Sequence, residues 1–246
     1  MKVLILAAGY ATRLYPLTKD YPKPLLEVKG KPIINYLIEQ LEAVPLVDEV
    51  FVVTNNKFMG IFGKWVKALK TSLKITLVND LTKSNADRLG AIGDLNFIIK
   101  KKKIQDDLLV IGGDNLFNGS LLKFINFSRK HLPAVCLGLY RLKQKKDASR
   151  YGVAKVNRQF KVTGFWEKPL KPQSNLVAMC LYYISKDCLS LSNDYLLETK
   201  GKVDATGSYI SWLEDKISIY GYVFSGAWFD IGDHKYLNAA KDSFSF

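Results

Sequence analysis

The residues best suited to chemistry near the N-terminus form a glycine-containing loop after a short apolar run. The loop covers residues 6–18, with the sequence LAAGYATRLYPLT, and Gly9 lies near its start. Such a loop lets backbone N–H groups approach phosphate closely. Arg13 adds a planar fork of donors that is always charged, and Lys23, in the sequence PKPLL, adds a second cation. These residues predict a site for a phosphorylated ligand.

Two common phosphate-binding loops do not match this one. A dinucleotide-binding loop requires GxGxxG and opens directly into a helix, whereas here only Gly9 is present. Pro16, Pro22 and Pro24 block an immediate helix. The second apolar run ends in Thr-Asn-Asn instead of an acidic residue, and no GK[ST] sequence forms a Walker A loop. A dehydrogenase is therefore disfavoured.

The chain is poor in the residues of zinc sites and catalytic triads. It contains only two histidines, His131 and His234, so chemistry must rest on Lys, Arg and carboxylates. Cys136, Cys180 and Cys188 form no CxxC pattern and no paired framework. This usage is typical of a reducing compartment, and we expect a cytoplasmic protein.

Strand-like and helix-like segments alternate in the first half of the chain and must position the loop. The predicted strands cover residues 3–7, 49–54, 73–78, 108–112 and 133–140, and the predicted helices cover 32–41, 58–69, 88–99 and 121–130. The alternation predicts an α/β protein with a Rossmann-like three-layer α/β/α fold and a mainly parallel central sheet. Ligands bind such sheets beyond the carboxyl ends of the strands.

The second half is richer in strands and predicts a strand-rich lobe. Its predicted strands cover residues 153–156, 162–166, 177–184 and 219–224, with the first two forming a hairpin around Asn157. Its predicted helices cover 186–197, 207–216 and 234–244. No Gly/Ser linker interrupts the chain, so we expect one domain over residues 1–246.

The formal net charge of +13 favours anionic partners, but the basic residues are spread along the chain. We expect the one dense run, residues 100–103, to be a solvated helix end. No nucleic-acid motif accompanies it, and no apolar stretch approaches the ~20 residues that span a bilayer. The sequence thus predicts neither a nucleic-acid partner nor membrane insertion, and a buried first strand instead of a signal peptide.

The pattern LAAGYATRLYPLT followed by KPLLEV resembles the N-terminal signature of the sugar-phosphate nucleotidylyltransferase family. This family includes glucose-1-phosphate thymidylyl- and uridylyltransferases and mannose-1-phosphate guanylyltransferase. The resemblance continues, in order, over nearly the whole chain. It implies transfer of a nucleoside monophosphate from an NTP to a sugar 1-phosphate, with release of pyrophosphate. Residues 1–140 would bind the nucleotide and residues 141–246 the sugar phosphate.

The resemblance assigns roles to the phosphate loop. In the family, the arginine of the signature and the lysine of KPLL stabilise the α-phosphate and the leaving pyrophosphate, so Arg13 and Lys23 are the catalytic candidates. The implied nucleotide-binding residues are Leu6, Ala7, Ala8, Gly9, Tyr10, Ala11, Thr12, Asn79, Asp80 and Gly90. Ala11 stands where many members carry glycine, and a Cβ there disfavours a positive φ.

The stretch at 85–93 falls where the family places its base- and sugar-reading loop. An alternative for this stretch is an ordinary helix N-terminus capped by Asn85 or Asp87.

Two further motifs imply bound magnesium (Mg2+). The sequence GGDN at 112–115 resembles the GD[NH] element of the family, and WFDIG at 228–232 resembles its W-x-D-x-G element. The resemblance makes Asp114 and Asp230 the metal ligands, and carboxylate oxygens suit a hard cation. Because the two residues are far apart in sequence, only the family fold implies that they meet.

Other motifs resemble the sugar-phosphate site of the family. They are the YG pair at 151–152, the EKP motif at 167–169 and the strand that begins near Asn175. The implied sugar-phosphate ligands are Tyr151, Gly152, Glu167, Lys168 and Asn175. Cys180 stands where glycine is common in the family.

Two alternatives stay open at this stage. One is an enzyme resembling phosphocholine cytidylyltransferase, and the other is a non-catalytic homologue that binds a nucleotide sugar and regulates a partner. The joint presence of two cations and two acidic residues disfavours the second. No hexapeptide-repeat tail and no extra C-terminal helices follow, so we expect no fused acetyltransferase and a monomer or homodimer.

Overall fold

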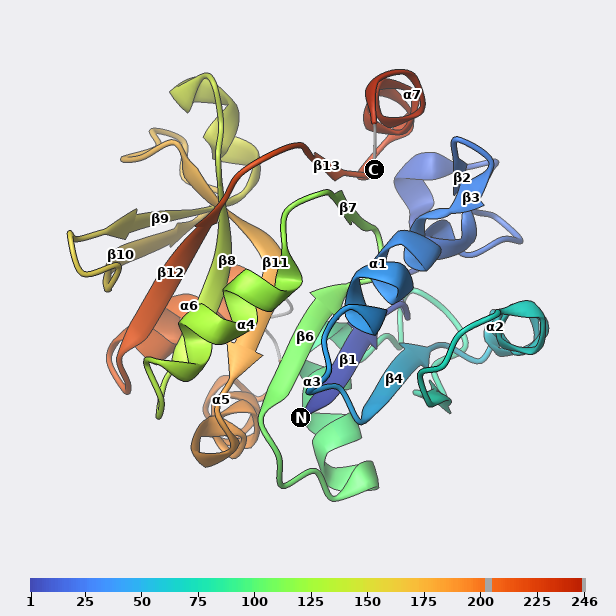
Figure 1. Ribbon diagram of the computed structural model, residues 1–246, viewed down its shortest axis with the longest axis horizontal. Helices are drawn as coiled ribbons and strands as arrows, with labels where there is room; N and C mark the ends of the chain where they lie inside the picture. Colours follow the sequence, from blue (N-terminus) through green and yellow to red (C-terminus); the bar gives the residue numbers. More distant parts are fainter. Residues whose placement is uncertain (202–204, 245–246) are drawn as a thin grey trace. The chain divides into compact units, whose positions relative to one another are not determined.

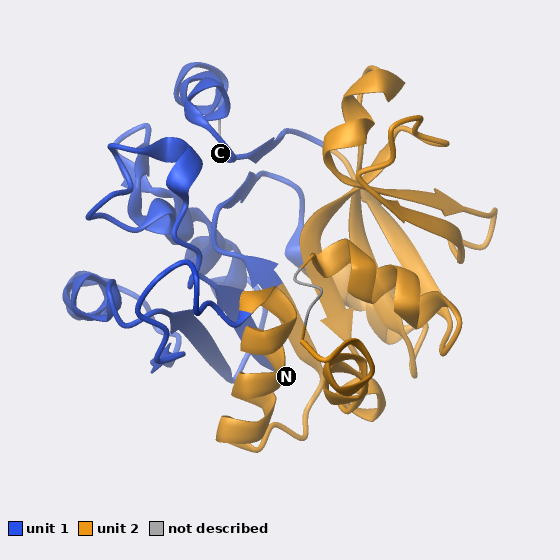
Figure 2. Cartoon of the chain, turned by 180° about the vertical axis from the view of Figure 1, so that it is seen from behind, with its two compact units in different colours: residues 1–89, 111–121, 226–246 blue, residues 90–110, 122–225 orange. Residues whose placement is uncertain are grey.

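The computed structural model describes residues 1–201 and 205–244, and the chain divides into two compact units. Unit 1 comprises residues 1–89, 111–121 and 226–246, and unit 2 comprises residues 90–110 and 122–225 (Figure 2). This division differs from the predicted boundary near residue 140. The signature loop and both acidic motifs lie in unit 1, whereas the YG and EKP motifs lie in unit 2.

The sheet of unit 1 is parallel. Its strands are β1 (Lys2–Leu6), β4 (Glu49–Thr54) and β5 (Ile75–Asn79), with β4 in the middle (Figure 1). Strands β1 and β4 are almost wholly buried runs of Val, Ile, Leu and Phe, as expected for parallel strands covered on both faces. The parallel pairing places the carboxyl ends of all three strands at one edge of the sheet.

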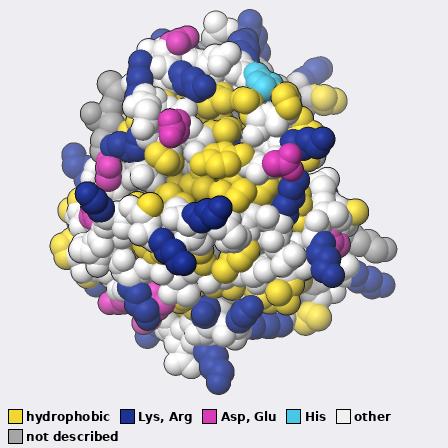
Figure 3. All heavy atoms as spheres, turned by 90° about the vertical axis from the view of Figure 1, so that its right-hand side faces the viewer, with side chains coloured by type: hydrophobic (Ala, Val, Ile, Leu, Met, Phe, Trp, Pro, Cys, Tyr) yellow, Lys and Arg dark blue, Asp and Glu magenta, His cyan; other side chains and the backbone are white. Residues whose placement is uncertain are grey.

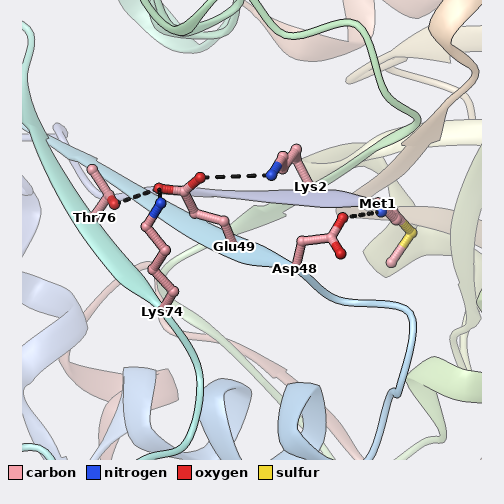
Figure 4. A network of polar contacts seen from close by, with 6 residues as sticks. All are labelled: Met1, Lys2, Asp48, Glu49, Lys74 and Thr76. Carbon is pink, nitrogen blue, oxygen red and sulfur yellow. Dashed lines mark hydrogen bonds and ion pairs between the residues drawn. The ribbon is translucent and has the colours of Figure 1, made fainter.

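The opposite, amino edge of this sheet is closed by a network of charges (Figure 4). The N-terminal ammonium contacts Asp48 Oδ2 at 2.6 Å, and Lys2 Nζ lies 3.6 Å from Glu49 Oε2. Glu49 Oε1 also accepts a hydrogen bond of 2.6 Å from the Thr76 hydroxyl and lies 3.1 Å from Lys74 Nζ. These contacts join the beginnings of all three strands.

Two short ribbons and three helices complete unit 1. The ribbons are β2 (Glu27–Val28) with β3 (Lys31–Pro32), and β7 (Asn115–Phe117) with β13 (Trp228–Asp230). The helices are α1 (Ile33–Glu42), α2 (Met59–Ala68) and α7 (His234–Ser243), and the 3-10 turns are η1 (Thr12–Leu14) and η2 (Lys23–Leu25). Proline at the start of α1 agrees with the prediction.

Unit 2 is the strand-rich part. Its strands are β8 (Val135–Arg141), β9 (Gly152–Val156), β10 (Val162–Glu167), β11 (Leu176–Ile184) and β12 (Ile219–Phe224). Strand β9 pairs antiparallel with β10 and β11, β8 pairs antiparallel with β11, and β8 pairs parallel with β12. The predicted hairpin forms around Asn157, whose Oδ1 accepts hydrogen bonds from the amides of Gln159 and Lys161.

Helices and turns surround these strands. The helices are α3 (Gly90–Lys102), α4 (Leu121–Arg129), α5 (Leu191–Thr199) and α6 (Thr206–Glu214), and the 3-10 turns are η3 (Lys145–Arg150) and η4 (Lys186–Cys188). The rings of Phe124 and Phe127 on α4 pack against Tyr222 of β12, with centroids 5.8 and 5.4 Å apart. Strand β6 (Leu108–Gly112) crosses the boundary between the units.

The predicted α/β class is confirmed, and most predicted elements match within two or three residues. The helix predicted at 186–197 is wrong in part, because it is interrupted and forms η4 and α5. The four strands of the two ribbons were not predicted, since two or three residues are too few to show a period. Residues 100–103 do form an exposed helix end. Within residues 1–201 and 205–244, no helix is long and apolar enough to cross a bilayer.

Candidate active site

The start of the signature loop is fixed by the end of β4. The amide of Ala7 donates to Val53 O at 2.9 Å, which extends the β1–β4 pairing into the loop. The Thr54 hydroxyl donates to Ala7 O, and Asn55 Nδ2 donates to Ala8 O at 2.8 Å. Thr54 and Asn55, at the end of β4, therefore position the phosphate loop. In a dinucleotide-binding fold, an acidic residue near this place would contact the ribose instead.

In the middle of the loop, two hydrogen bonds converge on one backbone carbonyl group. Ala11 O accepts a hydrogen bond of 2.7 Å from the buried Thr18 hydroxyl and one of 3.0 Å from the Leu14 amide. Ala11 itself adopts a left-handed conformation, with φ of 48°. The position thus has the backbone geometry that glycine favours, and alanine occupies it at a cost of about 1 kcal/mol.

Gly9 differs from Ala11 in its backbone conformation and makes no close contact with other parts of the protein. Its φ is not positive, and a Cβ built on it would meet no protein atom within 4 Å. Neither the backbone conformation nor the protein packing requires glycine at this position. The open space beside Gly9 suits the close approach of a ligand to the backbone.

The two predicted catalytic cations lie in different surroundings. Arg13 is exposed in η1, and within the described part of the chain it makes no ion pair or side-chain hydrogen bond. Lys23 Nζ forms an ion pair with Asp114 Oδ2, and the two side chains are 18% and 27% exposed. The structure therefore brings one predicted catalytic cation and one predicted metal ligand into direct contact.

Gly113 allows this contact by keeping three segments close together. Its amide donates to Leu6 O at 2.8 Å. A Cβ at this position would lie 2.9 Å from the same carbonyl oxygen and 3.2 Å from Pro24 Cγ. Any side chain would push the acidic turn away from β1 and from the lysine loop, so the second glycine of GGDN has a packing role.

The ribbon of β7 and β13 brings the two distant acidic motifs together. Asp230 pairs in register with Asn115, the residue next to Asp114. The indole N–H of Trp228 donates to Asn115 Oδ1 at 2.8 Å and ties the strands. Asn115 and Trp228 therefore hold the acidic pair in place. These roles could not be predicted from the sequence, although both residues belong to the GGDN and WFDIG motifs.

One apolar cluster supports all three charged segments. Leu14 follows Arg13, Leu116 lies two residues after Asp114, and Ile231 follows Asp230. These three apolar side chains are fully buried in the same cluster. Its other buried members are Val28, Ile33, Tyr36, Leu237, Ala240 and Phe244. Each of the three charged residues thus has a buried apolar neighbour in the chain, which fixes the backbone that carries it.

The donors present fit magnesium. Within residues 1–201 and 205–244, no group of three or more His, Cys, Asp or Glu side chains could hold a metal ion. A complete protein cage is therefore absent from this part, and Asp114 and Asp230 supply two carboxylates. Magnesium is commonly held by one or two carboxylates together with substrate phosphates and water, which this arrangement would permit.

Asn79 and Asp80 lie at the carboxyl end of β5, with Tyr10 close by. Asp80 is buried and accepts hydrogen bonds from the Thr82 amide and hydroxyl at 2.8 Å. The Thr82 hydroxyl lies 3.3 Å from that of Tyr10, and burial raises the pKa of Tyr10. Asn79 Oδ1 accepts from the amide of Leu81, which is exposed. Asp80 therefore organises the loop, and Asn79 and Leu81 lie at its surface.

The alternative of a helix cap at 85–87 is wrong for Asp87. Its carboxylate accepts hydrogen bonds from the Ser84 hydroxyl and amide and from the Lys83 amide, which closes a turn upstream of it. These bonds, led by that of the Ser84 hydroxyl, lower the pKa of Asp87 to about 2. Asn85 contributes its carbonyl group to Arg88. Gly90, in unit 2, begins α3 with φ of 75°.

Four of the five predicted sugar-phosphate residues lie together in unit 2. Glu167 pairs in register with Gly152 across β10 and β9, and the Lys168 amide donates to Tyr151 O at 3.0 Å. Lys168 Nζ lies 3.3 Å from Glu167 Oε1. The fifth, Asn175, differs in its contacts: its side-chain amide nitrogen donates to Leu142 O and its side-chain oxygen accepts from Arg141. Both polar groups of that side chain thus already have partners.

Sequence reasoning missed a residue that shapes the surroundings of Glu167. A Cβ on Gly207, in the first turn of α6, would lie 1.8 Å from Glu167 Oε2, and one on Gly152 would lie 3.2 Å from it. The carboxylate therefore lies against two glycines. Gly207 belongs to no quoted motif, and only the packing reveals it.

Cys180, like Ala11, has a positive φ although it is not a glycine. It has φ of 51° and lies in β11, where the register with β8 shifts between Ala178 and Tyr182. At both positions, where the resemblance leads one to expect glycine, the backbone of this chain is left-handed.

Comparisons with known proteins agree with this geometry. The model of the nucleotidyl transferase family matches residues 2–244. The chain is 29% identical to the bifunctional protein GlmU of Methanocaldococcus jannaschii, over 94% of this chain and 51% of that protein. It thus spans about half the length of that relative. It is 28% identical to glucose-1-phosphate thymidylyltransferase of Neisseria meningitidis, over 98% of this chain and 81% of that protein.

A solved structure shares the fold. UDP-glucose pyrophosphorylase complexed with UDP-glucose superposes with a TM-score of 0.81 at 21% identity, covering 98% of this chain and 97% of that one. The expected Rossmann-like fold is therefore confirmed. The family model covers almost all of the chain, and the resemblance found in the sequence is confirmed: the chain belongs to the nucleotidyl transferase family, among the sugar-phosphate nucleotidyltransferases.

Proposed function

We propose that this protein transfers a nucleoside monophosphate from an NTP to a sugar 1-phosphate and releases pyrophosphate. The observation that carries the proposal is the pairing of β7 with β13, which places Asp230 opposite the neighbour of Asp114. Lys23 contacts Asp114. A binding protein without catalysis has no need of this acidic pair beside a phosphate loop. Unit 1 would bind the NTP, and unit 2 would supply the acceptor residues.

The proposed reaction is an in-line attack of a sugar phosphate oxygen on the α-phosphorus of the NTP. The attacking oxygen is already ionised at pH 7, so the reaction needs no general base. This agrees with the scarcity of histidine, since the chain has only two. The barrier would fall mainly through positioning and neutralisation of charge.

The charged residues take different parts in this scheme. Arg13 and Lys23 would stabilise the α-phosphate and the departing pyrophosphate. Lys168 would contact the sugar phosphate, and Glu167, held against Gly152 and Gly207, would accept hydrogen bonds from sugar hydroxyls. Asp114 and Asp230 would hold Mg2+, which would supply positive charge that neutralises the negative charge of the reacting phosphates.

We also propose that the enzyme acts in the cytoplasm as a monomer or homodimer. Cys136, Cys180 and Cys188 are all free thiols, as expected in a reducing compartment. Sedimentation of the purified protein as a stable tetramer would contradict the proposed oligomeric state.

The decisive experiment measures pyrophosphate release with magnesium. It crosses dTTP, UTP, CTP, GTP and ATP with the 1-phosphates of glucose, mannose and N-acetylglucosamine, and with phosphocholine. We expect release with one NTP and one sugar phosphate. Release with CTP and phosphocholine alone would favour the alternative acceptor.

Two controls support this experiment. The first is Asp114→Asn, which should abolish release but retain the fold. The second omits magnesium and adds a chelator, which should also abolish release. Binding of NTP with no release for any pair would contradict catalysis and favour a regulatory homologue.

A further inference from the structure

Two loops of unit 2 emerge together from one end of the strands. The first covers residues 143–150, between β8 and β9, and the second covers residues 169–174, between β10 and β11. Their bases are joined, because the Leu142 amide donates to Asn175 O at 2.9 Å and the Lys168 amide donates to Tyr151 O at 3.0 Å. Figures 1 and 2 both show the two loops side by side. We call them the paired loops.

The paired loops and their bases are strongly basic. Six exposed cations lie there against one acidic residue: Arg141, Lys143, Lys145, Lys146, Arg150 and Lys171 against Asp147. Unit 2 as a whole has 21 basic and 11 acidic residues, whereas unit 1 has 15 and 12. The positive charge of the protein is therefore concentrated in unit 2.

Apart from the run at residues 100–103, which ends α3, the basic residues outside the paired loops are more widely spaced. On the face shown in Figure 3, Lys and Arg side chains are dispersed around a central apolar area and alternate with acidic and neutral side chains. Helix α2 carries Lys64 and Lys67, and Lys70 follows it, all three exposed. This spaced set provides a control for net charge.

The second of the paired loops also exposes a large apolar side chain. Leu170 is 97% exposed, more than any other large apolar residue in the described part of the chain. Its neighbours form the sequence Pro169-Leu-Lys-Pro172. The prolines fix their own φ angles and restrict the residue before each, so the loop cannot easily fold Leu170 back onto the protein. A fully exposed apolar side chain therefore lies beside a cluster of cations.

We propose that the paired loops are a docking surface for an anionic phospholipid bilayer. The lysines and arginines would lie at the negatively charged headgroups, and Leu170 would enter the boundary between headgroups and acyl chains. Peripheral membrane proteins use the same combination of basic charge and a small apolar anchor. The protein would bind reversibly at the surface, without spanning the bilayer.

The chemistry of the paired loops favours lipid over nucleic acid. Proteins that bind single-stranded nucleic acid combine cations with aromatic side chains on which bases stack. The paired loops, residues 143–150 and 169–174, contain no Phe, Tyr or Trp. An aliphatic side chain offers little to a base, whereas the headgroup boundary of a bilayer accommodates it.

The test measures co-sedimentation of the purified protein with vesicles. One set contains phosphatidylcholine only, and the other contains about one-third phosphatidylglycerol. We expect binding only to the anionic vesicles, weakening as salt is added. Replacing Lys143, Lys145 and Lys146 by Gln should lower the partition coefficient about 100-fold, since each lysine near an anionic surface contributes roughly fivefold. Leu170→Ser should lower it about tenfold.

Two matched variants separate docking from general charge and general apolarity. Replacement of Lys64, Lys67 and Lys70 by Gln removes the same charge from α2, and Leu197→Ser removes another exposed leucine, which lies in α5. Both should bind vesicles as the wild type does. All variants should retain NTP binding, which shows that they are folded.

Three outcomes would overturn the proposal. The first is absence of binding to anionic vesicles. The second is an equal loss of binding in both lysine triples, which would show that net charge alone matters. The third is binding of poly(U) RNA that depends on the paired loops, without vesicle binding, which would make the surface a nucleic-acid site.

Discussion

The two edges of the parallel sheet in unit 1 use charge in opposite ways. At the amino edge, Glu49 contacts Lys2, Lys74 and Thr76, and Asp48 contacts the N-terminal ammonium (Figure 4). At the carboxyl edge, Arg13 is exposed and makes no ion pair within the described residues. The amino edge pairs its charges in a network within the protein, whereas the carboxyl edge combines one ion pair, Lys23 with Asp114, with the exposed Arg13.

The difference shows where this unit gains stability and where it keeps capacity for a ligand. Burial alone raises the pKa of Glu49, but hydrogen bonds from Thr76 and Lys74 and the charges of Lys74 and Lys2 outweigh burial and lower it. A lowered carboxyl pKa means that the folded state favours the charged form. At the carboxyl edge, the buried anchors Leu14, Leu116 and Ile231 position the backbone, and the charged side chains contribute little.

The largest expected effect comes from the acidic pair at the carboxyl edge. Asp114→Asn should lower turnover by about 10³-fold, because it removes one carboxylate of the proposed metal site. The free energy of unfolding should change by less than about 1 kcal/mol, since the pair with Lys23 is partly exposed. Pyrophosphate release and urea unfolding measure the two quantities. A large loss of stability with normal turnover would contradict this contrast, because it would show that Asp114 stabilises the fold and is not needed for catalysis.

Arg13 tests the same edge with a residue that contacts no partner. Arg13→Gln should reduce turnover by about 10²-fold through loss of charge stabilisation at the phosphates. Stability should stay within about 0.5 kcal/mol of the wild type, as is usual for exposed residues. Thermal unfolding gives the second value. Arg158→Gln is a suitable control, because Arg158 is an exposed arginine in the turn between β9 and β10 and lies outside the proposed catalytic set.

Glu49 tests the amino edge. Glu49→Gln should cost about 2 kcal/mol of stability at pH 7 and leave turnover unchanged, because it removes charged hydrogen bonds far from the phosphate loop. The lowered pKa gives a stabilisation that is present above the unfolded value of 4.5 and lost as the pH falls through the folded value. Denaturation of both proteins from pH 7 to pH 3 should therefore show their stabilities converging in acid. A constant difference would contradict the ionic origin of the effect.

The smallest expected effect concerns the backbone of the loop. Ala11→Gly should stabilise the protein by about 0.5–1 kcal/mol, because glycine adopts the φ of 48° without strain. The gain is reduced by the greater freedom of glycine in the unfolded chain. Gly9→Ala provides the contrast: it should leave stability unchanged, since no protein atom lies within 4 Å, and weaken NTP binding. Calorimetry would measure both.

The helices and the longer strands could be predicted from sequence because each has enough residues to show its period. The strands β4, β6 and β12 begin and end where predicted. The helix predicted at 186–197 could not be resolved into η4 and α5, because its apolar spacing continues across the interruption.

The sequence by itself determined the phosphate loop. Arg13 and Lys23 belong to contiguous motifs, and local rules such as the Thr18 hydrogen bond to Ala11 act over a few residues. It also determined the α/β class, since buried parallel strands require continuous apolar runs. These features depend on neighbours in the chain, and the amino-acid order records them directly.

Only the tertiary structure decided which charges meet. Asp114 and Asp230 come together through strands of three residues each, too short to leave a pattern, and through a shared core with Leu14. The setting of Glu167 depends on Gly207, which lies 40 residues further along and has no side chain to mark it. Such contacts arise from packing between distant segments, and packing is a property of the folded chain as a whole.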